Sequence, residues 1–134
     1  MDCIYCGHKT TVANSRPQKR LQQVWRRRKC THCSAIFTTT EGVELGGSLM
    51  VRNGTRKLLP FDRDYLYLSV HSALGHRKDA VSAASALTAT IIAELRKATT
   101  GAVLERSDVV RHALTVLKRF DTVAAVQYGA YHKL

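Results

Sequence analysis

The chain has 134 residues, and its 21 Lys or Arg against 10 Asp or Glu give a formal net charge of +11 and a pI near 10.0. This length suits one ordinary domain or two very small ones, and neither an apolar run of membrane-spanning length nor a secretory signal is visible, so we expect an intracellular protein. The excess of positive charge indicates an anionic partner, either nucleic acid, nucleotide or an acidic membrane surface.

Two CxxC pairs lie in the first third of the chain. They hold all the cysteines of the chain: Cys3, Cys6, Cys30 and Cys33. This spacing is typical of a structural zinc site, in which four thiolates close the tetrahedral shell and leave no position for a substrate. His8 and His32 are alternative ligands beside the pairs. In a secreted protein the same cysteines would form two disulfides, and in an enzyme they would serve as redox dithiols.

Residues 1–41 are predicted to form a zinc ribbon with short strands around residues 10–13, 24–28 and 35–39. This segment has few large apolar residues, so the metal must supply most of its folding free energy. Trp25 is predicted to be the one large core residue of the ribbon, and the alternative is that it stacks on a base or a sugar.

A basic run leads directly into the second CxxC pair. Residues 1–41 hold eight Lys or Arg against two acidic residues, a formal charge of +6. Seven of these cations are the predicted DNA contacts: Arg16, Lys19, Arg20, Arg26, Arg27, Arg28 and Lys29. Alternation along a strand places Arg26 and Arg28 on one face and Arg27 and Lys29 on the other. Guanidinium groups suit phosphate oxygens and the guanine edge, so we expect nucleic-acid binding rather than a merely solvated surface.

A segment with three glycines, residues 42–48, is the predicted linker to a second domain at 49–134. Residues 49–59 are predicted to form a β-hairpin, because Asn53 and Gly54 are the favoured pair for a type I′ turn, in which both positions need a positive φ.

Four helices are expected after this hairpin, ending near residues 75, 98, 120 and 131. Their predicted N-caps are Asp62, Asp79, Ser107 and Asp121. In the second helix an apolar stripe recurs at intervals of three and four: Val81, Ala84, Leu87, Ile91 and Leu95. The fold class is therefore α+β, a small zinc-ribbon β domain followed by a mostly helical domain that begins with a β-hairpin. No Walker loop and no catalytic triad pattern occurs, so we expect no enzyme.

Taken in order, these motifs resemble the NrdR family of bacterial zinc-ribbon repressors over nearly the whole chain. After the first CxxC pair comes Val-Ala-Asn-Ser-Arg at 12–16, where the family has aspartate in place of Asn14. Three arginines and a lysine precede Cys30, and Phe-Thr-Thr-Thr-Glu at 37–41 resembles the family's Phe-Thr-Thr-x-Glu ending.

The family's second half is an ATP-cone, and the resemblance implies a nucleotide site there. Its residues in this chain are Arg52, Asn53, Gly54, Arg56, Lys57, Phe61 and Arg77. Three positions depart from the family: Val51 replaces the phosphate-binding lysine, Tyr65 replaces a lysine of the first helix, and His76 replaces the lysine of a Lys-Arg pair. Such a cone either neutralises the triphosphate with its remaining cations or has lost nucleotide binding.

The resemblance implies a zinc-dependent, nucleotide-responsive transcriptional repressor of ribonucleotide reductase genes, cytoplasmic and nucleoid-associated, with one structural zinc per chain. Its expected partners are double-stranded DNA, ATP or dATP with magnesium, and further copies of itself, with no membrane. The alternative is a zinc-ribbon RNA-binding or ribosome-associated module that does not respond to nucleotide.

Overall fold

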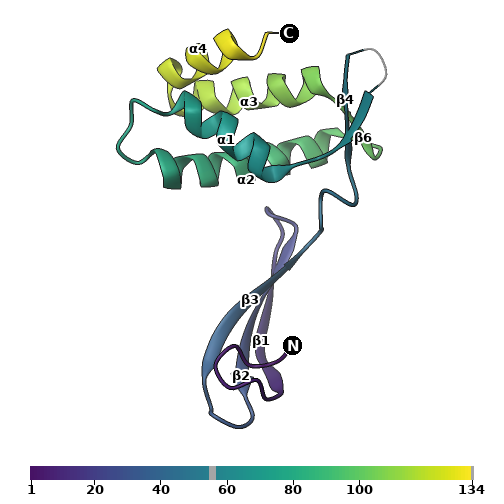
Figure 1. The fold of residues 1–134 in the computed structure, drawn as a ribbon, viewed down its shortest axis with the longest axis vertical. Helices are drawn as coiled ribbons and strands as arrows, with labels where there is room; N and C mark the ends of the chain where they lie inside the picture. Colours follow the sequence, from purple (N-terminus) through teal and green to yellow (C-terminus); the bar gives the residue numbers. More distant parts are fainter. Residues whose placement is uncertain (55–56, 134) are drawn as a thin grey trace. The chain divides into compact units, whose positions relative to one another are not determined.

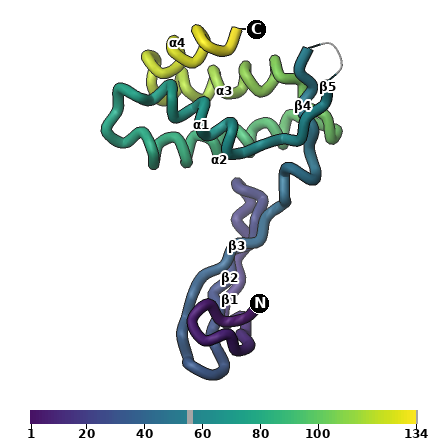
Figure 2. The backbone as a smooth tube through the Cα atoms, in the orientation of Figure 1, coloured from purple at the N-terminus to yellow at the C-terminus, as the bar shows by residue number. Residues whose placement is uncertain are grey.

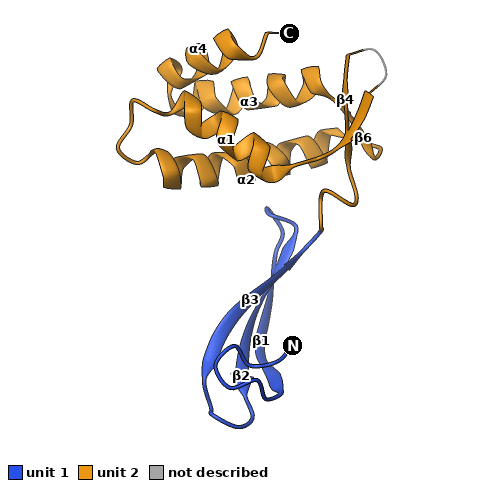
Figure 3. Ribbon diagram, viewed as in Figure 1, with its two compact units in different colours: residues 1–43 blue, residues 44–134 orange. Residues whose placement is uncertain are grey.

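The computed structural model describes residues 1–54 and 57–133, and its contacts divide the chain into two compact units, Met1–Val43 and Glu44–Leu134 (Figure 3). The first unit is an antiparallel sheet and the second is mostly helical, which confirms the predicted α+β class. The division falls inside the glycine-rich segment 42–48. Within the described residues, no helix combines the length and the apolar character needed to cross a membrane.

The first unit is a three-stranded sheet in the order β1-β2-β3 (Figure 1). Its strands are β1 at Thr10–Gln18, β2 at Gln23–Cys30 and β3 at Ile36–Gly42. They are longer than predicted, because the ladder continues through polar residues that carry no strand signal of their own. The register of β1 on β2 shifts between Val12 and Asn14, which marks a β-bulge.

This unit has no apolar core among its described residues. Its only buried side chains are those of Cys3 and Cys30, whereas Trp25 is half-buried. The prediction that Trp25 forms the core of the ribbon is therefore wrong. A thin sheet has nothing packed against its second face, so one large ring cannot be enclosed there.

The second unit begins with a hairpin of β4 (Met50–Asn53) and β5 (Lys57–Pro60), which the backbone trace of Figure 2 follows. Asn53 is the last residue of β4 and pairs with Lys57, so three residues separate the strands. The predicted two-residue type I′ turn is therefore wrong, and of the predicted pair only Gly54 has a positive φ, +66°.

A third strand, β6 at Val103–Glu105, pairs in parallel with β4 and completes a sheet in the order β5-β4-β6. Sequence reasoning missed this strand. It is only three residues long, and its partner lies about fifty residues earlier in the chain. Neither the alternation of apolar residues nor a nearby turn motif therefore predicts it.

Four helices follow the hairpin, interrupted by β6: α1 at Arg63–Ala73, α2 at Ala80–Ala98, α3 at Arg106–Phe120 and α4 at Thr122–Tyr131. Asp62 caps α1 through Oδ1, which accepts from the backbone N–H of Asp64 and of Tyr65. Asp121 caps α4 in the same way, accepting from Ala124 N–H at 3.0 Å. These two predicted caps are confirmed.

The other two predicted caps differ from the structure. Asp79 stands at the N-cap position of α2, but its carboxylate makes no capping hydrogen bond and is held by Arg77 instead. Helix α3 begins at Arg106, so Ser107 lies inside the helix and is not its cap.

The core of the second unit lies between the helices. Its fully buried side chains of largest volume are Leu74, Ile91, Leu95, Leu117, Val70 and Thr88. The stripe predicted on α2 is confirmed except at its first position, where Val81 is 65% exposed and Ala80 is buried in its place. Ala80 precedes Ala84 by four residues, so helical geometry places these two on the same face.

The glycine-rich segment ends in an ordered turn at the start of the second unit. The Glu44 carboxylate accepts from the backbone N–H of Gly46 at 3.1 Å and of Gly47 at 2.5 Å. A Cβ at Gly47 would lie 2.6 Å from Glu44 Oε2, so glycine leaves the room that this carboxylate needs. Leu45 and Leu49 pack against the helical core, so the turn is anchored to that core.

Candidate zinc site and nucleic-acid interface

Two backbone turns of the same shape present the cysteines. Each CxxC pair is followed at once by a residue with a left-handed backbone, Gly7 with φ +75° and Ser34 with φ +61°. That conformation reverses the chain just after the second cysteine, and it favours glycine and short polar residues. The two turns thus bring four thiols from residues 3–6 and 30–33 to one place.

The four sulfur atoms all lie within 4.8 Å of one another. Cys3 Sγ is 3.7 Å from Cys33 Sγ, and Cys6 Sγ is 3.5 Å from Cys30 Sγ. Tetrahedral zinc with Zn–S bonds of about 2.3 Å requires sulfur–sulfur distances of about 3.8 Å, whereas a disulfide requires about 2.05 Å. The cluster therefore fits one zinc ion, and the four thiols are not paired as disulfides.

Backbone N–H groups already point at the sulfurs. Cys30 Sγ accepts from the N–H of His32 at 3.3 Å and of Cys33 at 3.4 Å, and Cys3 Sγ accepts from Tyr5 at 3.4 Å. Burial raises the pKa of the Cys30 thiol, but these donors and the neighbouring Cys6 sulfur outweigh it and lower the pKa to about 6. At Cys33 the Ala35 N–H lowers the pKa of the thiol, but burial and the neighbouring sulfurs outweigh it and raise the pKa. Zinc binds thiolates, so the local donors favour metal at Cys30, and the four sulfurs together need the positive charge of the ion.

The two histidines beside the site are not part of the cluster. The rings of His8 and His32 stack on one another with their centroids 4.0 Å apart, and His8 Nδ1 lies 3.2 Å from the carbonyl oxygen of Cys6. In the described residues, the side chains placed to hold a metal are the four cysteines alone.

The seven predicted DNA contacts all lie in the first unit, but they differ in their surroundings. Arg26 forms an ion pair with Glu41 across the β2–β3 ladder. Arg28 donates to Thr39 Oγ1 at 3.2 Å and reaches Thr10 Oγ1 at 3.5 Å. The other five fall into two groups. Arg16, Arg27 and Lys29 are exposed strand residues, and Lys19 and Arg20 lie at the β1–β2 turn.

The predicted nucleotide residues do not all come together. Four belong to the β4–β5 hairpin: Arg52, Asn53, Gly54 and Lys57. Arg52 forms an ion pair with Glu105 of β6 at 3.1 Å. Phe61 is 5% exposed and belongs to the core, and Arg56 lies outside the described residues.

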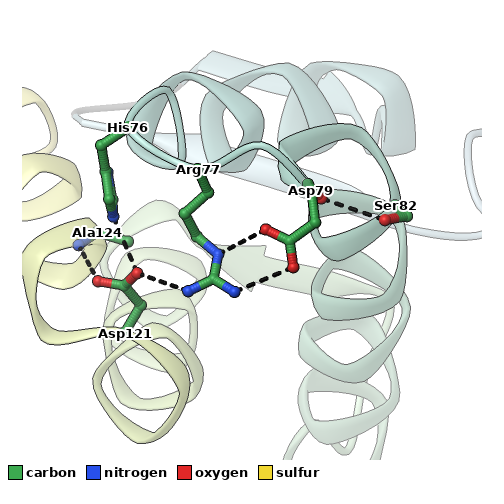
Figure 4. A network of polar contacts seen from close by, with 6 residues as sticks. All are labelled: His76, Arg77, Asp79, Ser82, Asp121 and Ala124. Carbon is green, nitrogen blue, oxygen red and sulfur yellow. Dashed lines mark hydrogen bonds and ion pairs between the residues drawn. The ribbon is translucent and has the colours of Figure 1, made fainter.

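Arg77 lies apart from that hairpin. The connection between α1 and α2 is at the opposite end of the helical unit from β4 and β6 in Figure 1, and the 19 residues of α2 span about 28 Å. The Arg77 guanidinium is also fully engaged. It forms a bidentate ion pair with Asp79 at 2.8 and 3.0 Å, contacts Asp121 at 3.1 Å, and lies 4.6 Å from the Phe120 ring centroid (Figure 4).

Asp121 is the centre of this network. Its Oδ2 meets His76 Nε2 at 2.9 Å as well as Arg77, while its Oδ1 caps α4 (Figure 4). The hydrogen bond with His76, followed by the Ala124 N–H and Arg77, lowers the pKa of the Asp121 carboxyl. The network joins the α1–α2 connection to the α3–α4 junction. Sequence reasoning missed it, because the partners stand 44 and 45 residues apart.

We expect Asp121→Asn to destabilise the helical unit at neutral pH, because the amide can still cap α4 but cannot form an ion pair with Arg77. Since folding lowers the pKa of Asp121, its contribution is present above the ordinary value of 3.8 and is lost as the pH falls below it. The difference from the unchanged protein should therefore shrink between pH 5 and pH 3. Urea unfolding followed by helical circular dichroism measures it.

Asp108→Asn is the matched control, since it breaks an exposed pair with Arg111 on the surface of α3. We expect it to have little effect at either pH. A constant gap between Asp121→Asn and the unchanged protein across this range would contradict the assignment of the charge to the network.

Comparison with known proteins gives two findings. The family model described as the N-terminal domain of NrdR-like transcriptional repressors matches residues 1–41. Three relatives bear the name transcriptional repressor NrdR. The protein from Leptothrix cholodnii is 36% identical, with 99% of this chain and 90% of that protein covered. Those from Maricaulis maris and Phenylobacterium zucineum are 34% and 33% identical, over 99% of this chain and 82% and 85% of theirs.

Proposed function

Because this chain belongs to the NrdR family of transcriptional repressors, a regulatory and not an enzymatic family, we propose that it represses ribonucleotide reductase genes in response to adenine nucleotides. In this proposal the ribbon, residues 1–41, binds operator DNA and depends on zinc. Residues 49–134 sense ATP or dATP, with magnesium, and control the oligomeric state.

The observation that carries the DNA-binding part is the continuity of the metal site with a cationic strand. Cys30 is both a metal ligand candidate and the last residue of β2, and the four residues before it are cations. Metal binding therefore holds this strand in the ladder and fixes the direction of its side chains. A rigid array of cations suits the phosphate backbone of duplex DNA.

The nucleotide part rests on the β4–β5 hairpin. Lys57 and Arg52 are exposed there beside the turn at Gly54, and Lys57 has no ion-pair partner in the described residues. We propose that these two cations take the place of the family lysine that Val51 replaces. We leave Arg77 out of this set, because its guanidinium is engaged elsewhere.

Exposed apolar side chains on two neighbouring helices support self-association. They lie on α1 and α4, which contact one another: Tyr65, Leu68, Val123, Val126 and Tyr131. Apolar side chains gathered on a soluble unit mark interaction surfaces. We propose that nucleotide shifts the population between assemblies, of which only one presents the ribbons at the spacing of the operator half-sites.

Calorimetric titration of the zinc-loaded, nucleotide-stripped protein with ATP and with dATP, each with magnesium, tests the sensing part. We expect at least one nucleotide to bind and Lys57→Ala to weaken it about tenfold, since a hydrogen bond to a charged group contributes about 1.5–3 kcal/mol. Lys118→Ala removes the same charge from the exposed end of α3 and is the matched control. Absence of binding by both nucleotides would contradict the sensing part.

The DNA-binding part is tested with duplexes from upstream of reductase genes, measured with and without each nucleotide. We expect binding that requires zinc, falls steeply with salt and differs between ATP and dATP. A structured RNA hairpin is the competitor, because tighter binding to RNA without any nucleotide response would support the RNA-module alternative instead.

A further inference from the structure

The two faces of the ribbon sheet differ in what covers them. Directly opposite residues of an antiparallel pair point to the same side, and alternate residues of a strand point to opposite sides. The face that carries Cys30, Arg28 and Arg26 is the covered one. Phe37, which pairs with Arg28, lies on this face. Its ring meets the Tyr5 ring of the first CxxC turn edge-on, with the two ring centroids 6.3 Å apart.

Cations on the covered face are used within the sheet. Arg26 forms an ion pair with Glu41 of β3, so the Glu41 carboxylate neutralises the positive charge of this arginine. Arg28 bridges Thr39 of β3 and Thr10 of β1, so it ties the three strands together two residues before the metal site. Both arginines are partly buried. Two of the four cations in the basic run therefore hold the strands of the sheet together.

The opposite face is open, and we call it the Trp25 face. Its members on β2 are Gln23, Trp25, Arg27 and Lys29, and the register adds Arg16 of β1 directly opposite Trp25. The side chains of the three cations, Arg16, Arg27 and Lys29, are exposed and have no ion-pair or hydrogen-bond partner among the described residues. On β3 the same face carries Thr38 and Thr40, both exposed.

The Trp25 side chain lacks the partners that a tryptophan usually has. It is half-buried, belongs to no apolar cluster, has no aromatic partner, and its indole N–H has no acceptor in the described part of the chain. Tryptophan usually finds a partner for both its ring and its N–H. A large ring among three free cations is the composition of a surface that binds nucleic acid, where the cations hold phosphates and the ring contacts sugars and bases.

We propose that the Trp25 face is the DNA-contacting surface of the ribbon. Arg16, Arg27 and Lys29 hold phosphates there, and the Trp25 indole packs against the sugars and base edges between them. Arg26 and Arg28 serve the sheet and not the DNA. This proposal rests on the proposed DNA-binding function, and it assigns that function to one face and to a residue outside the basic run.

The protein's only tryptophan provides a direct test, because its fluorescence reports this face alone. The probe is a fluorescein-labelled, mixed-sequence duplex of about 30 base pairs at low salt, where non-specific binding suffices. Anisotropy of the label follows binding to the zinc-loaded full chain, and acrylamide quenching follows access to Trp25. We expect DNA to change Trp25 emission and to protect the indole from acrylamide.

The outcomes separate the two proposals. If anisotropy shows binding while Trp25 emission and its access to acrylamide stay unchanged, DNA lies on another surface, so the face assignment is overturned and the DNA-binding function stands. If the zinc-loaded protein does not bind the duplex, or binds only a structured RNA hairpin of similar length, both proposals are overturned.

Matched double variants provide a second test. Arg27→Ala with Lys29→Ala and Arg26→Ala with Arg28→Ala each remove two positive charges from the same strand, from opposite faces. We expect the first pair to lower affinity strongly and to reduce the slope of log affinity against log salt by about 1.8, since each phosphate contact contributes about 0.9. The second pair should keep the slope, provided that it retains one zinc per chain. Equal changes in slope would overturn the face assignment.

Trp25 variants complete the test on the ring. We expect Trp25→Ala to weaken duplex binding about tenfold at constant zinc content, and Trp25→Phe to recover part of this loss, because a smaller ring keeps some of the contact. Wild-type affinity in the alanine variant would remove the indole from the interface. The fluorescence test on the unchanged protein decides the face even if these variants lose zinc.

Discussion

Removal of zinc should unfold residues 1–43 and leave the helical unit folded. The ribbon has no apolar core in its described residues, since only Cys3 and Cys30 are buried. A structural zinc site contributes about 10–16 kcal/mol at neutral pH, which exceeds what such a sheet gains from burial. Trp25 lies in the first unit and all the helices lie in the second, so tryptophan emission and helical circular dichroism follow the two units separately.

The experiment is a titration with a strong chelator, followed by zinc addition. We expect Trp25 emission to shift to that of a solvent-exposed indole while the helical signal stays constant, and zinc to restore the native emission. Cys30→Ser should reproduce the chelated state, because the Cys30 side chain is the most buried in the ribbon. Native emission in the presence of excess chelator would show that the sheet holds itself together without metal.

Loss of zinc should also weaken the proposed duplex binding strongly. The cations of β2 lie on a strand that ends in Cys30, so unfolding of the ribbon removes their fixed arrangement. A disordered basic segment still attracts DNA weakly, and a residual affinity with a shallower salt dependence is therefore expected. The proposed nucleotide binding by the helical unit should be unaffected, which would separate the two proposed activities in one preparation.

The second large effect is expected from Leu117→Ala in the last turn of α3. Leu117 is fully buried in the helical core, and truncating such a leucine costs about 2–5 kcal/mol through lost burial and the cavity left behind. Whole domains are stable by only about 5–15 kcal/mol, so the variant should unfold at a much lower urea concentration. Helical circular dichroism against urea measures the change.

Leu68→Ala is the matched control, because Leu68 is 59% exposed on α1 and loses the same atoms. We expect its effect to stay within about 0.5 kcal/mol at protein concentrations where the chain is monomeric. The unfolding of the ribbon, followed by Trp25 emission, should not move in either variant. A shared transition would show that the two units unfold together.

Much of the metal site and of the helical unit could be predicted from local sequence. Zinc ligands are recognised by spacing alone, since two CxxC pairs can close a tetrahedral shell wherever the chain between them runs. Asp62 and Asp121 were correctly predicted as caps, because a cap needs only the backbone of the next three residues. The buried stripe of α2 follows from helical period in the same way.

Other features depended on partners that local patterns do not reveal. Strand β6 exists because β4 offers it a free edge. Asp79 was predicted as a cap, yet Arg77 holds its carboxylate, and Arg77 was assigned to phosphate, yet Asp79 and Asp121 hold its guanidinium. Arg77 stands only two residues before Asp79, but Asp121 follows it by 44 residues, and no local rule states that such a distant side chain will arrive.

The basic run shows the same division most clearly. That four cations precede Cys30, and that they alternate between two faces of a strand, follows from residue order and strand geometry alone. Which of the two faces is open depends on contacts between segments that are distant in the chain. On one face of the sheet Tyr5 of the first CxxC turn packs against Phe37 of β3, and Glu41 and Thr39 bind the arginines there. The charges left free for a partner are therefore set by packing between segments that the zinc site brings together.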